Sequence, residues 1–161
     1  MVRAGKYQKE SDGEKILELG RTYMRDAEKS EKESDYIAAE SIYHMCCDIF
    51  SSLIPCEPVQ RSSDYNNTKS AQQKASFEIE ARGEYMHALF RYAMLPQISE
   101  MEKVQYLEQA YDQAALLEKE TGDVEYAIAV DCIREEQAVL SKSLQKQGQN
   151  LWITGGYEPG L

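Results

Sequence analysis

Apolar side chains recur along this sequence at intervals of three and four residues, the spacing that gathers them on one face of an α-helix. No stretch of useful length shows the strict alternation of apolar and polar residues that is typical of a β-strand. Prolines, glycines and capping residues divide the pattern into segments. The sequence therefore predicts an all-α fold, a bundle or superhelix of about five antiparallel helices.

The first two helices are expected on either side of a short turn. A capping box of Ser11 and Glu14 predicts the start of the first helix. The second is expected to begin at Ser34 or Asp35 and to end before Pro55, which cannot continue a helix.

The rest of the chain predicts an exposed loop over about 55–69, three further helices and an irregular tail. The expected helices are about 70–95, then from a Ser99/Glu102 capping box to 120, and, after a stop at Gly122 and a cap at Asp123, a last one that fades near Gly148. The tail, about 148–161, holds the one tryptophan. At 161 residues, the chain is expected to form a single domain.

The helix expected over 70–95 should be central, because apolar residues surround most of its circumference. Its polar strip follows one line along the helix and consists of Glu80, Glu84, His87 and Arg91. The strip is either a solvated face, which spacing alone favours, or the wall of a groove. Glu78 and Arg82 fall within the apolar arc instead, where they are expected to pair with each other.

Composition excludes several classes of partner. Acidic residues outnumber basic ones 28 to 18, giving a net charge of -10, and no basic cluster is long enough to follow a nucleic-acid backbone. No apolar run approaches the length of a membrane span, and the N-terminus lacks the apolar core of a signal peptide. We therefore expect a cytoplasmic or nuclear protein with reduced cysteines.

The sequence does not favour an enzyme, a metal site or a bound cofactor. Glu84 and His87 have the ExxH spacing of di-iron bundles, but no second ExxH accompanies them and both histidines, His44 and His87, lie opposite the apolar stripes of their helices. No nucleophile or nucleotide-binding fingerprint is present. Cys46 and Cys47 lie on or beside a buried stripe, which favours a packing role.

A tetratricopeptide-like scaffold or co-chaperone is one interpretation, because helical pairs joined by short turns could stack. The segment from Ser34 to Cys46 has the small and aromatic spacing of that repeat's second helix, but the later helices are too long for a period of about 34 residues. A metal-binding bundle and a purely structural subunit of a larger assembly are the remaining alternatives.

From Cys46 onward, the chain resembles a divergent and shortened 14-3-3 protein. Five segments, in the order that the family shows, carry this resemblance: Cys46–Pro55; Phe77 with Gly83-Glu84-Tyr85 and Leu89; Ala110-Tyr111-Asp-Gln-Ala114; Ala127–Asp131; and Asn150-Leu151-Trp152. The resemblance implies a superhelix with a concave groove and a non-enzymatic adaptor that binds segments of partner proteins phosphorylated on serine or threonine. The family works as a homodimer, which the shorter N-terminal region of this chain puts in doubt.

By position, the resemblance implies peptide-binding or phosphate-binding roles for eight residues: Glu80, His87, Ala88, Arg91, Val130, Asp131, Leu151 and Trp152. Several depart from the family. His87 replaces the phosphate-binding arginine, Ala88 the tyrosine beside it, and Glu80 a lysine; Asp131 and Val130 replace the groove asparagine and its leucine neighbour.

These departures predict weak or altered recognition of phosphate. A guanidinium holds a phosphate through two parallel charge-assisted bonds, which a histidine replaces poorly. Glu80, Glu84 and Asp131 add repulsion toward a phosphate, and Arg91, one turn beyond His87, is the candidate to compensate. We expect the groove to prefer an unphosphorylated, basic segment.

Overall fold

A computed structural model describes the backbone of residues 2–55 and 69–155 and the side chains of residues 12–55 and 75–146. Within these ranges the chain forms five helices and no strand, so the all-α prediction is confirmed. The helices are α1 (Val2–Lys32), α2 (Tyr36–Ser52), α4 (Lys69–Ala93), α5 (Glu100–Thr121) and α6 (Val124–Gly155). None of the described helices is long and apolar enough to cross a bilayer.

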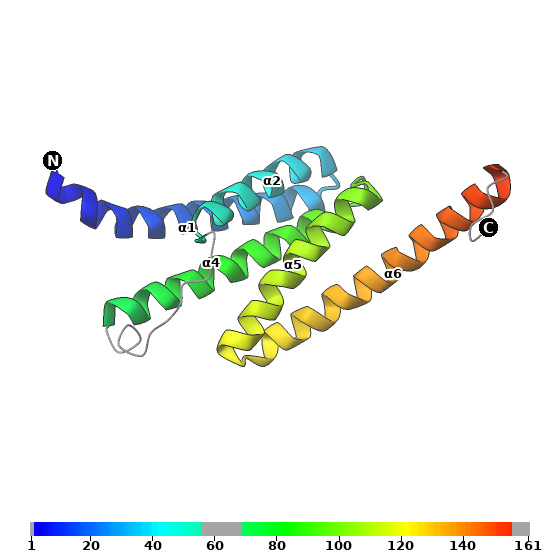
Figure 1. Ribbon diagram of the computed structural model, residues 1–161. Coiled ribbons are helices and arrows are strands. Elements are labelled where there is room, and N and C mark those ends of the chain that lie inside the picture. Colours follow the sequence, from blue (N-terminus) through cyan, green and yellow to red (C-terminus); the bar gives the residue numbers. More distant parts are fainter. Residues whose placement is uncertain (1, 56–68, 156–161) are drawn as a thin grey trace.

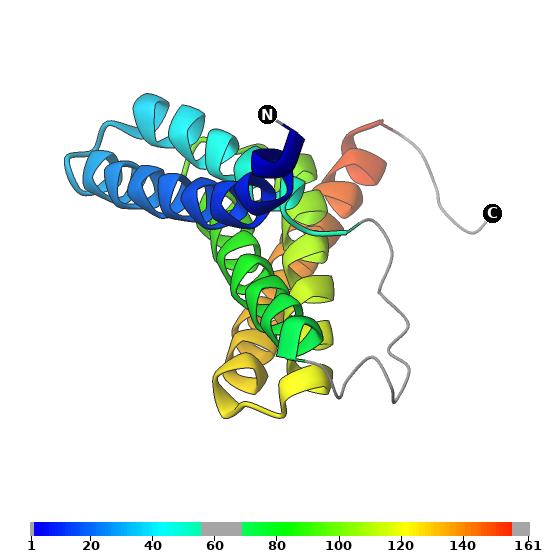
Figure 2. The same ribbon diagram turned by 90° about the vertical axis from the view of Figure 1, so that its left-hand side faces the viewer.

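Each helix packs mainly against its neighbours in the sequence. The α1–α2 hairpin runs across one end of the α4–α5 pair (Figure 2), and α6 packs antiparallel to α5 and extends beyond the other helices at its C-terminal end (Figure 1). α4 contacts α2 on one side and α5 on the other, which confirms its predicted central position.

Capping residues fix the starts of α2 and α5 and the end of α5 as the sequence predicted. The side chain of Asp35 accepts a hydrogen bond from the amide of Ala38 at 3.2 Å, and that of Ser99 accepts one from the amide of Glu102, also at 3.2 Å. Gly122 ends α5 with a φ of 66°, a left-handed conformation that glycine adopts without strain.

Two predicted helix ends were wrong. α1 begins at Val2, so Ser11 lies inside the helix and does not cap it. Lysine, glutamine and glutamate are frequent before Ser11 and no proline interrupts them, so nothing ends the helix there. α6 passes Gly148 and ends at Gly155, because one glycine costs a helix only about 1 kcal/mol. Residues 56–68 and 156–161, most of the expected loop and part of the expected tail, lie outside the described residues.

Interdigitated apolar side chains from all five helices form the core. Its largest fully buried members are Tyr43, Phe50, Leu89, Leu95, Leu107, Leu117 and Cys46. The two histidines stay out of this core. α1 and α2 approach closely at Gly20, where the ring of Phe50 fills the space that a side chain would occupy. The Sγ of Cys46 lies 3.7 Å from the carbonyl oxygen of Gly20 at the same crossing.

Candidate functional site

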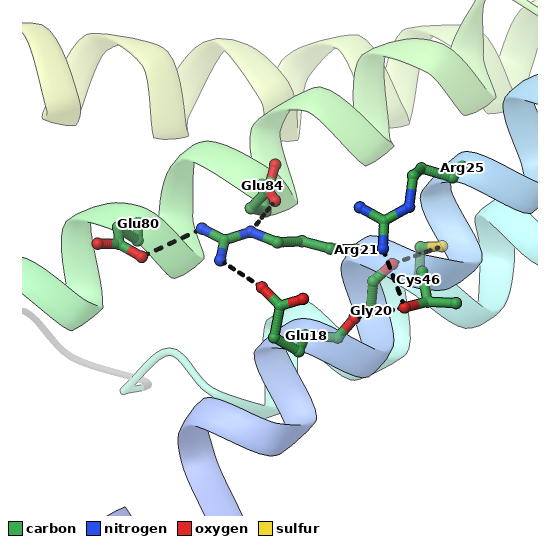
Figure 3. A network of polar contacts seen from close by, with 8 residues as sticks. Glu18, Gly20, Arg21, Arg25, Cys46, Glu80 and Glu84 are labelled. Carbon is green, nitrogen blue, oxygen red and sulfur yellow. Dashed lines mark hydrogen bonds and ion pairs between the residues drawn. The ribbon is translucent and has the colours of Figure 1, made fainter.

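The polar strip of α4 faces α1, and Arg21 of α1 connects the two helices. Its guanidinium donates from Nε to Glu84 at 2.7 Å and from Nη2 to Glu80 at 3.1 Å, while Nη1 donates to Glu18 on its own helix at 3.0 Å (Figure 3). The hydrogen bond to Glu84 is the largest cause of the raised pKa of Arg21. The strip is therefore neither fully solvated nor an empty wall, because an arginine from another helix occupies part of it.

A shallow hollow of about 300 Å³ lies beside this network, between α1, α4 and the start of α6. It is lined by Arg21, Glu80, Gly83, Glu84, Met86, His87 and Tyr126. Gly83 contributes no side chain, and a Cβ at that position would stand 3.4 Å from the hydroxyl of Tyr126. The hollow thus offers carboxylates, one guanidinium, one imidazole and two large apolar surfaces within one small volume.

Acidic groups outnumber basic ones around Arg21. Arg21 carries one positive charge against the three carboxylates that it contacts, Glu18, Glu80 and Glu84. Burial, followed by four surrounding carboxylates, raises the pKa of Tyr126 above its ordinary value. Since Glu80 and Glu84 are two of those four, their negative field reaches across the hollow to α6.

Arg91 forms a second connection between α4 and α1. Its Nη2 donates to Glu31 at 2.9 Å, its Nη1 lies 3.7 Å from Glu28, and its Cζ is 5.9 Å from the ring centroid of Tyr43. The hydroxyl of Tyr43 also donates to Glu31, at 2.8 Å. Arg91 is therefore paired with two carboxylates and does not line the hollow. In this position it does not replace the phosphate-binding arginine at the hollow, as the sequence had suggested.

The structure brings only part of the predicted site together. Glu80 and His87 line the hollow, and both are exposed. Ala88 and Val130 are buried in the core, with exposed fractions of 0% and 6%, because each lies on the side of its helix that packs against its neighbours. These two side chains are not available to a ligand.

The other predicted site residues lie on α6. Asp131 is exposed and is not part of the lining of the hollow. Leu151 and Trp152 lie on α6, which the sequence did not expect to extend so far, and their side chains are outside the described residues.

Five residues of the hollow were not among the predicted site residues, although Glu84 was placed on the polar strip: Arg21, Gly83, Glu84, Met86 and Tyr126. One signal was available, because a glycine in the middle of a long helix often marks a close approach or an open space. Arg21 carried no such signal. It is one of several charged residues on α1, and its partners on α4 are distant in the sequence.

The predicted pair of Glu78 and Arg82 is confirmed. Nε of Arg82 donates to Glu78 at 2.8 Å, and its Nη1 donates to Gln113 of α5 at 2.9 Å. Arg82 is the one buried charged side chain in the described part of the chain, with an exposed fraction of 4%. Its contacts with both helices satisfy a charge that would otherwise be costly to bury.

The cysteines of α2 are packing residues, as predicted. Cys46 and Cys47 are buried, and burial raises the pKa of each thiol to about 12. No three His, Cys, Asp or Glu side chains in the described part of the chain are grouped as metal ligands would be. Comparisons of the chain with protein-family models, curated proteins and solved structures find no match.

Proposed function

We propose that this protein is a non-enzymatic adaptor, acting in the cytoplasm or nucleus, that binds peptide segments of partner proteins on the face formed by α1, α4 and α6. The observation that carries the proposal is the hollow on that face. Ligand sites are typically concave, largely preformed and lined by apolar surface with a few polar groups. The hollow is more polar than most such sites, and it combines two large side chains with apolar surface, Met86 and Tyr126, with the charged groups around Arg21.

The resemblance to 14-3-3 proteins supports the same function from the sequence. The resemblance and the hollow both favour a binding surface on the helices over a catalytic centre. The proposal differs from the family's usual activity in the ligand, because carboxylates already engage the guanidinium groups of Arg21 and Arg91.

The arginine that lines the hollow, Arg21, and the arginine of the polar strip, Arg91, are both paired with carboxylates. Arg21 is shared among three carboxylates, and Arg91 is held by Glu28 and Glu31. A phosphate would have to displace these carboxylates while remaining close to them, and repulsion between like charges opposes that exchange. We therefore infer that the adaptor binds an unphosphorylated segment at least as tightly as its phosphorylated twin.

The test is fluorescence polarisation with two peptides, one carrying phosphoserine in an arginine-rich context and the other its unmodified twin, at two salt concentrations. The proposal expects the unmodified peptide to bind at least as well. Gly83→Tyr, which fills the hollow, should abolish binding, whereas Ser141→Tyr, a matched change at an exposed position of α6, should not. Tighter binding of the phosphorylated peptide would contradict the inferred preference, and no effect of Gly83→Tyr would contradict the site. Equal binding of both peptides at another face would favour the tetratricopeptide-like scaffold.

A further inference from the structure

The carboxylates of the hollow have unused bonding capacity. Arg21 contacts a single oxygen, Oε2, on both Glu80 and Glu84. In the part of the chain that the structure describes, no protein group bonds Oε1 of either residue. The two residues are one helical turn apart, so their free oxygens border the same stretch of α4.

The remaining lining suits the side chain of an arginine. A guanidinium offers several N–H donors in one plane, bonds carboxylates readily and stacks on aromatic rings. Tyr126 provides such a ring, and Met86 provides apolar surface for the aliphatic part of the arginine side chain. Gly83, also on the lining, has no side chain that would obstruct the ligand.

Charge favours the same ligand. Arg21 and the three carboxylates that it contacts have together a net charge of -2, and the whole chain has a net charge of -10. A cationic segment is attracted to such a surface, and an anionic one is repelled. We propose that the hollow binds an arginine side chain from an unphosphorylated segment of a partner protein, between Glu80 and Glu84 and against Tyr126. This inference rests on the proposed adaptor function and names its ligand.

Two fluorescent peptides that differ at two positions only test the inference with the full chain. All other residues of both peptides are glycine and serine. At the two variable positions one peptide has arginine and the other has citrulline, which has nearly the same shape but no charge. We expect the arginine peptide to bind about tenfold more tightly, the effect of losing a charge-assisted contact.

Two double variants then locate the effect. Glu80→Gln with Glu84→Gln should remove the preference for arginine, while the amide oxygens can still accept hydrogen bonds from Arg21. Glu108→Gln with Glu135→Gln makes the same change in net charge at exposed positions outside the lining, and it should keep the preference. Circular dichroism melting shows whether each variant is folded.

Arg21→Gln provides a test in the opposite direction. It frees both carboxylates of α4, so the arginine peptide should bind more tightly than it binds the wild type; a general loss of structure could not produce this result. Unchanged or weaker binding to Arg21→Gln would overturn the inference, as would equal loss of preference in the two double variants. Equal binding of the arginine and citrulline peptides would overturn it while leaving a peptide-binding adaptor, whereas no binding of either peptide would overturn the proposed function as well.

Discussion

Gly20 determines how closely α1 and α2 can approach. A Cβ built at Gly20 would stand 2.4, 2.7 and 3.1 Å from three ring atoms of Phe50. Nonbonded carbon atoms normally lie about 3.5–4.0 Å apart, so the two helices would have to separate by roughly 1 Å or the ring would have to move. Phe50 is fully buried, so its ring cannot move without displacing other core side chains. The substitution Gly20→Ala therefore creates a clash that the core cannot easily relieve.

The expected magnitude is the difference between two effects. Overpacking of a well-packed core costs about 1–3 kcal/mol, and the severity of this overlap places Gly20→Ala near the upper end. Alanine also favours a helix over glycine by about 1 kcal/mol. We therefore expect Gly20→Ala to lower the free energy of unfolding by about 2 kcal/mol.

Gly83 provides a matched control in another helix. A Cβ there would lie 3.4 Å from its nearest neighbour, the hydroxyl of Tyr126, which is an ordinary contact. Gly83→Ala should therefore raise the free energy of unfolding by up to about 1 kcal/mol. Urea denaturation followed by circular dichroism measures both variants. An increase in stability for Gly20→Ala similar to that for Gly83→Ala would refute the reasoning, and partial recovery in Gly20→Ala with Phe50→Leu would support it.

Three further predictions concern buried groups. An alkylating reagent at neutral pH should modify the exposed Cys132 rapidly, and Cys46 and Cys47 only after denaturant is added; mass spectrometry of the digested protein separates these sites, and equal rates would contradict the burial. The unfolding free energy should fall as the pH rises above about 9. In the unfolded chain the thiols lose protons near the ordinary pKa of 9.0, whereas in the folded protein burial raises the pKa of Cys46 and Cys47 to about 12. Urea titrations between pH 8 and 11 in the presence of reductant measure this loss, which should be smaller when both residues are replaced by alanine. Arg82→Met should destabilise the protein by about 3 kcal/mol, because it leaves Glu78 without its buried partner. The double variant Arg82→Met with Glu78→Met should recover much of that loss, and no recovery would contradict the account of the pair.

Local signals made most helix boundaries predictable. The caps at Asp35 and Ser99 and the left-handed Gly122 each depend on residues within one turn, so the sequence contains the whole motif. The central position of α4 was also predictable, because a helix with apolar residues around most of its circumference needs neighbours on several sides. By contrast, the start of α1 and the end of α6 are not marked by a strong capping or stop signal. A boundary without such a signal is harder to predict from the sequence.

The candidate site was predictable only in part, because it depends on contacts between distant segments. The sequence placed Glu80, Glu84 and His87 on one line, but it did not indicate that Arg21 would lie against them. A helical pattern specifies which side of a helix is buried, and it does not specify which charged residue of another helix meets it. Ala88 was assigned to the site through a resemblance, whereas its own packing places it in the core.

The most direct test of the proposed adaptor function is a nuclear magnetic resonance titration of the full chain, labelled with nitrogen-15, with the unmodified arginine peptide. If the peptide binds in the hollow, the amide signals that shift most will belong to the face of α1, α4 and α6, including those of Arg21, Gly83, His87 and Tyr126. Shifts confined to α2 and α5, or no shifts at saturating peptide, would contradict the proposal that this face binds peptide segments.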